Sequence, residues 1–144
     1  MSKLVFNKPI EHLTKPKEYP LSGAELKARL NPLGLEKSYL WDLNYWFISL
    51  EDWGKVLRDV CLGMPKYSTD KFDCENFAML VSARVSERYQ LNTCGIAIGK
   101  SPFGEHGYNL LIHKDNLIYF EPQTGDYIPI EDGSYKAHTV IYGG

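Results

Sequence analysis

The chain has 144 residues, of which 44% are hydrophobic and 24% are charged, and its formal net charge is −2. This length suits a single domain, and the composition is that of an ordinary globular protein. The small negative charge gives no electrostatic case for a nucleic-acid partner or for an anionic membrane surface. No stretch approaches the roughly 20 apolar residues that cross a bilayer, so we expect no membrane partner.

The cysteines are Cys61, Cys74 and Cys94, which are widely and irregularly spaced. Because an odd number at such spacing does not suit a disulfide framework, we expect free thiols in a reducing, cytoplasmic compartment. The chain start also lacks the apolar region of a secretory signal. No HExxH motif, close cysteine pair or histidine cluster is present, and the glycines form no phosphate-binding loop, so we expect no metal and no cofactor.

The first part of the chain begins with an expected extended arm over residues 1–21, which has room for one short strand. Ser22 and Glu25 then form a capping-box pattern, which predicts a short helix that ends at Leu30. Residues 35–48 are rich in aromatic side chains, and we expect them to form either a helix or a packed loop.

A second helix is predicted to begin after Ser49, because apolar side chains recur at helical spacing as far as Cys61. A longer helix is predicted over residues 73–89, with an apolar stripe along one face. After Gln90 the pattern changes to a period of two, which is typical of strands. The strands are expected at residues 93–99, 107–113, 117–121, 127–130 and 137–142.

Helices followed by an antiparallel sheet predict an α+β fold. We find no repeat and no linker, so residues 1–144 are expected to form one domain.

Cys74 lies in the segment FDCENFA, residues 72–78, in the first turn of the long predicted helix. It shares a helical face with Phe77 and Val81 and should point toward the sheet. Unpaired backbone N–H groups at a helix start favour a thiolate, and such a thiol can have its pKa lowered from about 8.5 to roughly 3.5–7.5. The alternative is that Cys74 fills the core and Asp73 merely caps the helix.

His106 opens one predicted strand in the segment EHGYN, and Glu121 ends the next strand in the segment FEP. A two-residue hairpin turn at residues 114–115 or 115–116 would place both side chains on one face of the sheet. In the first of these registers, Gln123 lies opposite His106 and is the second candidate to orient its imidazole. A three-residue turn would move Glu121 to the other face. The alternatives are a structural histidine and a solvated glutamate.

The other histidines fit a site less well. His113 has the opposite parity to His106 and should face elsewhere. His12 and His138 have no acidic or thiol neighbour at useful spacing in the sequence.

Taken together, the segments DCENFA, EHGYN and FEP resemble the transglutaminase-like branch of the papain-like cysteine-enzyme superfamily, including small uncharacterised bacterial or phage proteins of that superfamily. The resemblance covers residues 70 to 130. It implies a nucleophile helix packed on the sheet, with Cys74 as nucleophile, His106 as general base and acid, and Glu121 as the third member of a triad.

The sequence departs from that family pattern at three places. The acid is Glu where Asp is usual, and Gly107 stands where Ala is usual. No upstream Gln or Trp is assignable as an oxyanion donor, and Tyr67 is the candidate for that role.

Two functions are compatible with these features. The first is a cysteine-dependent amide hydrolase or acyltransferase that acts on a peptide or protein amide. The alternative is a catalytically inactive binding module of the same fold, which engages a protein partner through an aromatic-rich surface that includes Trp41, Tyr45 and Trp46.

Overall fold

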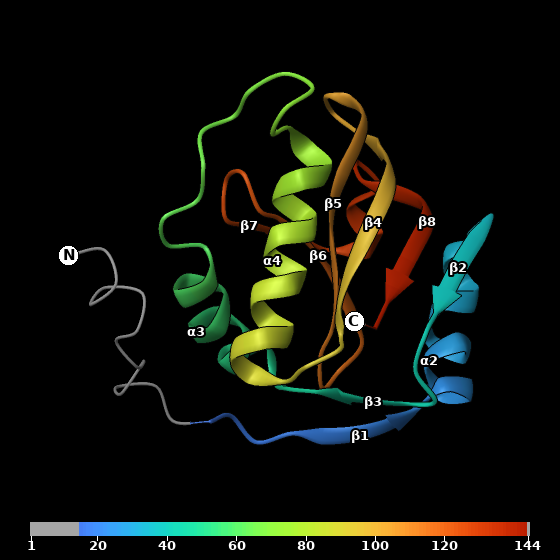
Figure 1. Ribbon diagram of the computed structural model, residues 1–144. Coiled ribbons are helices and arrows are strands. Elements are labelled where there is room, and N and C mark those ends of the chain that lie inside the picture. Colours follow the sequence, from blue (N-terminus) through green and yellow to red (C-terminus); the bar gives the residue numbers. More distant parts are fainter. Residues whose placement is uncertain (1–14, 144) are drawn as a thin grey trace.

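The computed structural model describes residues 15–143, which form a six-stranded sheet, a two-stranded sheet and three α-helices (Figure 1). The predictions for residues 1–14 lie outside the described part of the chain. In chain order the strands and α-helices are β1 (Tyr19–Ser22), α2 (Gly23–Leu30), β2 (Lys37–Leu40), β3 (Asn44–Phe47), α3 (Leu50–Val60), α4 (Cys74–Tyr89), β4 (Cys94–Ser101), β5 (Gly104–Ile112), β6 (Leu117–Glu121), β7 (Asp126–Ile128) and β8 (Lys136–Tyr142).

The larger sheet has the strand order β2-β8-β4-β5-β6-β7. Its strands pair antiparallel except for β2, which runs parallel to β8. Strands β1 and β3 form the separate antiparallel pair. The sheet is therefore mixed, and its edge strand β2 comes from a part of the chain far from the other five strands.

The predicted fold class was wrong. It placed helices before a purely antiparallel sheet in a papain-like or transglutaminase-like core, whereas β1, β2 and β3 precede α3 and one of them pairs in parallel. The error arose at residues 35–48, which form two strands instead of a helix or packed loop. In β3, Tyr45 and Phe47 are buried while Asn44 and Trp46 face outward. This alternation, with the aromatic preference for strands, is the signal that was missed.

The helix predictions were confirmed. At the start of α2, the Ser22 hydroxyl accepts a hydrogen bond from the Glu25 N–H, and the Glu25 carboxylate accepts one from the Ser22 N–H. The Ser49 hydroxyl caps α3 in the same way by accepting from the Asp52 N–H. Each cap satisfies backbone donors that the first helical turn leaves unpaired.

Helix α4 packs against β4 and β5, with α3 beside it (Figure 1). Val81 and Val85 of α4 are fully buried against that face, and Leu111 of β5 meets them there. The indole N–H of Trp53 in α3 donates to the Ile112 carbonyl at 2.8 Å, which ties α3 to the end of β5. The opposite face of the sheet carries a second apolar cluster, which contains α2 side chains together with Tyr108 and Leu110. Within residues 15–143, no helix has the length and apolar character that crossing a membrane requires.

The first turn of α4 approaches β5 most closely at Gly107. A Cβ atom added at this glycine would lie 2.8 Å from the Glu75 Cα, a backbone atom that has no free rotation with which to move away. Glycine is therefore required here by the close approach of helix and strand. The same contact determines where Cys74, the residue before Glu75, lies relative to the sheet.

We expect Gly107→Ala to lower the free energy of unfolding by about 1–3 kcal/mol, because the added methyl group forces α4 away from β5. Gly54→Ala is the matched control, since its added Cβ would lie 3.7 Å from the Tyr127 Oη, an ordinary contact. In the interior of α3, alanine should raise stability by up to about 1 kcal/mol. Urea unfolding of both variants measures the difference, and equal stabilities would show that the start of α4 moves freely.

Candidate functional site

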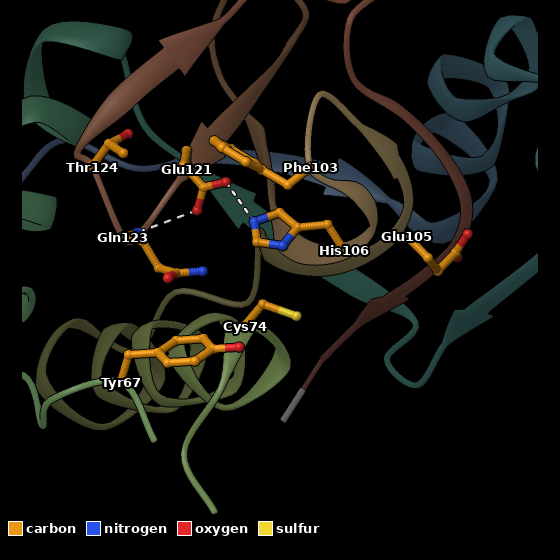
Figure 2. Close-up of a pocket in the computed structure, with 8 residues that line it drawn as sticks. All are labelled: Tyr67, Cys74, Phe103, Glu105, His106, Glu121, Gln123 and Thr124. Atoms are coloured by element: carbon orange, nitrogen blue, oxygen red, sulfur yellow. Dashed lines mark hydrogen bonds and ion pairs between the residues drawn. The ribbon is translucent and has the colours of Figure 1, made fainter. Parts of the chain in front are cut away.

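A pocket of about 340 Å³ opens where the start of α4 meets the ends of β5 and β6 (Figure 2). It contains all five residues that the sequence singled out as site candidates: the proposed triad and both orienting or oxyanion candidates. Its lining residues are Tyr67, Cys74, Phe103, Glu105, His106, Glu121, Gln123 and Thr124. Five residues spread over more than fifty positions of the sequence are thus brought to one cavity.

The β5–β6 hairpin brings His106 and Glu121 together. Its register pairs Ile112 with Leu117, and the His113 N–H donates to the Asn116 carbonyl at 2.9 Å, so the turn has two residues as expected. His106 Nε2 consequently lies 2.6 Å from Glu121 Oε1, and both side chains are buried, with 8% and 2% of their surfaces exposed.

The carboxylate of Glu121 receives two further hydrogen bonds. The Tyr135 hydroxyl donates to Oε1 at 2.9 Å, and the backbone N–H of Gln123 donates to Oε2 at 3.2 Å. Because Glu121 accepts hydrogen bonds from both of these donors, it is an ionised carboxylate that only accepts. In the 2.6 Å contact between His106 and Glu121, the Nε2–H of His106 is therefore the donor. The second ring nitrogen, Nδ1, then lies on the side of the imidazole that faces Cys74 (Figure 2).

Tyr135 was not among the site residues predicted from the sequence. This residue lies just before β8, in a loop that begins with the short 3-10 helix Ile130–Asp132 and turns at Gly133 with φ of 78°. Nothing in the local sequence connects Tyr135 with Glu121. Gln123 was expected to face His106 with its side chain, but it stabilises the pair through its backbone N–H.

The Cys74 thiol is half-buried at the pocket wall and is not part of the apolar core. Its sulfur donates a hydrogen bond to Glu75 Oε2 at 3.2 Å rather than to His106. Burial is the largest cause that raises the pKa of the thiol; the Gly107 N–H offsets part of it, and the Glu75 carboxylate raises the pKa further. The expected lowering of this pKa was therefore wrong, because burial and an adjacent carboxylate outweigh the helix start.

His113 and His138 lie outside the pocket. His113 is buried, and its Nδ1 accepts a hydrogen bond from the Asp115 N–H, in line with its opposite parity. The interpretation of His138 was wrong, since its Nε2 contacts the Glu105 carboxylate and its Nδ1 lies 3.7 Å from Glu36 Oε2. These three residues come from segments that only the sheet brings together. His12 lies outside the described residues.

The predicted aromatic-rich surface differs in part from the structure, whereas the cysteines are free as expected. Trp41 and Trp46 are exposed, but Tyr45 is fully buried, so the aromatic-rich surface is smaller than expected. Cys61 is partly buried and Cys94 is buried, and the cysteines at 61, 74 and 94 are all free. Across residues 15–143, no group of three or more His, Cys, Asp or Glu side chains is arranged to hold a metal ion.

Comparison with known proteins gives one family and two informative structures. The family model described as "Agglutinin C-terminal" matches residues 45–127. The structure described as "PSL1a-E64 complex" is 28% identical, with a TM-score of 0.71, and the match covers 85% of this chain and 51% of that chain. The Polyporus squamosus lectin bound to the human-type influenza-binding epitope Neu5Acα2-6Galβ1-4GlcNAc is also 28% identical, with a TM-score of 0.66, and covers 85% and 49%.

This chain therefore spans about half the length of those two solved structures. No curated protein matches it significantly.

These findings correct the resemblance drawn from the sequence. The matched family model includes the segments DCENFA, EHGYN and FEP, and it is an agglutinin family rather than a transglutaminase-like one, so the predicted family was wrong. The papain-like fold class and the cysteine hydrolase or acyltransferase function, with its triad chemistry, were drawn from that resemblance and are overturned with it. The alternative of a binding module is closer to a lectin, but the comparisons support neither a protein partner nor an amide substrate.

We expect iodoacetamide to label Cys74 slowly at neutral pH, because the raised thiol pKa leaves little thiolate. Labelling should accelerate as the pH rises through that pKa. Glu75→Gln should speed labelling at neutral pH, since it removes a carboxylate that disfavours the thiolate.

The measurement uses mass spectrometry in a background that carries Cys61→Ser and Cys94→Ser. Glu87→Gln, on the same helix but away from the pocket, is the matched control and should change nothing. Fast labelling at neutral pH that Glu75→Gln does not alter would contradict the assignment of the raised pKa.

Proposed function

Because the chain belongs to the agglutinin C-terminal family, we propose that it is a ligand-binding module whose site is the pocket between Cys74, His106 and Glu121. The observation that carries this proposal is the convergence of buried polar groups on one cavity. Buried polar side chains are costly unless they are hydrogen-bonded, and a cavity with a few oriented polar groups is the usual form of a small-molecule site.

The volume and lining of the pocket favour a small, polar ligand. About 340 Å³ lies at the lower end of the range that small-molecule pockets occupy. His106 offers Nδ1 as an acceptor, because Glu121 holds the hydrogen on Nε2. The side chains of Gln123 and Thr124 add an exposed amide and an exposed hydroxyl at the mouth.

The E64 complex of a similar structure supports a small ligand as the first candidate. That structure is a complex of PSL1a, and the match with it includes most of this chain. We therefore take E64 as the probe for the pocket of this protein, and we expect the ligand to contact Cys74 and His106.

A saccharide is the second candidate, and the lectin among the similar structures, which is bound to a trisaccharide, favours it. Tyr67 and Phe103 line the pocket with 56% and 72% of their surfaces exposed. Exposed aromatic faces beside polar groups complement a sugar ring, which has both apolar faces and hydroxyl groups. Since the matched part is only half of that lectin, the trisaccharide must be tested on this chain directly.

We expect E64 to bind this protein, and we expect His106→Ala to weaken the binding about tenfold or more, as loss of a central contact does. Trp41→Ala is the matched control, because Trp41 is an exposed aromatic residue outside the pocket. Native mass spectrometry measures occupancy, and ¹⁵N–¹H NMR locates the perturbed amides.

The trisaccharide Neu5Acα2-6Galβ1-4GlcNAc and its neutral disaccharide Galβ1-4GlcNAc are titrated in parallel. Amide shifts near Tyr67 and Phe103 with the disaccharide would favour the saccharide candidate. The proposal fails if no ligand perturbs the pocket, or if Trp41→Ala rather than His106→Ala weakens binding.

A further inference from the structure

We propose a second ligand site at the end of the sheet that lies opposite the pocket. Lys17, Lys114 and the Tyr19 ring form this site, and its ligand is a dianionic oxyanion such as sulfate or phosphate. The pocket opens at the first residues of β5, whereas Lys114 lies in the turn that follows the last residue of β5 (Figure 1). The inference therefore goes beyond the proposed function and does not depend on it.

Two stacked aromatic rings form the floor of this site. Tyr19 of β1 pairs directly with Phe47 of β3, and their rings stack with centroids 5.4 Å apart and 24° between their planes. The Arg29 guanidinium of α2 lies over the Phe47 ring, 4.9 Å from its centroid. The ammonium groups of Lys17 and Lys114 both lie over the Tyr19 ring, each 5.4 Å from its centroid. Segments that are distant in the sequence thus place three cations on one pair of rings.

The two ammonium groups are placed so that one ligand can contact both. Because Phe47 stacks on one face of Tyr19, the nitrogens of Lys17 and Lys114 share the face that remains. Each ammonium has three N–H donors, and the ring uses none of them as a conventional hydrogen bond. A tetrahedral oxyanion presents several acceptor oxygens and can therefore bridge the two groups with charge-assisted hydrogen bonds.

These lysines lack the carboxylate partner that a nearby lysine has. Lys15 pairs with Glu18 at 3.7 Å, but neither Lys17 nor Lys114 forms an ion pair within the part of the chain that the structure describes. Both side chains belong to exposed residues, so a dissolved anion can reach them. Two like charges held over one ring repel each other, and an anion between them replaces that repulsion with attraction.

Arg29 holds the turn that carries Lys114 and adds to the positive charge. Its Nη1 donates to the carbonyls of His113 at 2.9 Å and Asn116 at 3.5 Å, one at each end of the turn. These acceptors are neutral, so they leave the charge of the guanidinium uncancelled. Asp115 is the carboxylate of the turn, and it forms no ion pair with a residue that the structure describes. Three cations thus face one carboxylate here, and the site has a net positive charge.

The charge of the site favours a dianion over a monoanion, because Coulomb attraction grows with the charge of the ligand. The attraction at an exposed site is screened by salt, so the affinity should fall as the ionic strength rises. Sulfate remains a dianion across neutral pH and is the first probe. Phosphate is the second probe, and acetate is the monoanionic comparison.

Titrations followed by ¹⁵N–¹H NMR at constant ionic strength test the inference. We expect sulfate and phosphate to shift the amide signals of Tyr19 and Lys114 and to saturate in the millimolar range. Acetate should bind about threefold weaker or less tightly still. Lys17→Gln and Lys114→Gln should each weaken sulfate binding about threefold or more. Lys55→Gln, at an exposed lysine of α3 that pairs with Asp52, is the matched control and should change nothing.

The inference is overturned if sulfate shifts neither amide, or if acetate and sulfate bind equally at the same ionic strength. It is also overturned if Lys55→Gln weakens binding as much as Lys17→Gln and Lys114→Gln do. The substituted lysines are exposed, and urea unfolding checks that each variant keeps its stability. Because the pocket amides report on the proposed function separately, failure at Tyr19 and Lys114 leaves that proposal standing.

Discussion

The buried carboxylate of Glu121 is the group on which the pocket depends. A charge with so little solvent exposure is tolerated only when nearby donors replace the lost water. Here the donors come from β5, from the turn after β6 and from the loop before β8, through His106, Gln123 and Tyr135. One carboxylate thereby ties three separate segments together and holds the imidazole in one orientation. Removing one partner of such a buried group costs about 3–5 kcal/mol.

The thiol illustrates how the environment, and not the position on a helix, decides reactivity. Cys74 occupies the first turn of α4, where backbone N–H groups favour negative charge. Partial burial and the neighbouring Glu75 carboxylate oppose this and prevail, so the pKa of the thiol is raised. The same Glu75 backbone packs on Gly107, so a single close contact between helix and strand sets both the location and the environment of the sulfur.

Local patterns predicted much of the secondary structure and the key register. The caps at Ser22 and Ser49 mark the helix starts, because side-chain capping depends only on residues three apart. The two-residue turn at residues 114–115 sets the pairing of β5 with β6, and this pairing places His106 and Glu121 on one face. Both features are short-range, so both are visible in the sequence.

Longer-range features were misjudged for a common reason. Strand β2 was missed because it gains its hydrogen bonds from β8, about a hundred residues away. The contacts of His138 with Glu105 and of Tyr135 with Glu121 likewise cross strands that are distant in the chain. The family resemblance also failed, because three short segments carry less information than the whole matched region.

The sequence by itself determined the helices, most of the strands and the meeting of an imidazole with a carboxylate, since capping, periodicity and hairpin pairing act between near neighbours. Only the tertiary structure decided the mixed sheet, the third partner of Glu121, the state of the thiol and the set of side chains that lines the pocket. These depend on which distant segments come into contact and on how much water that contact excludes, and local sequence patterns encode neither.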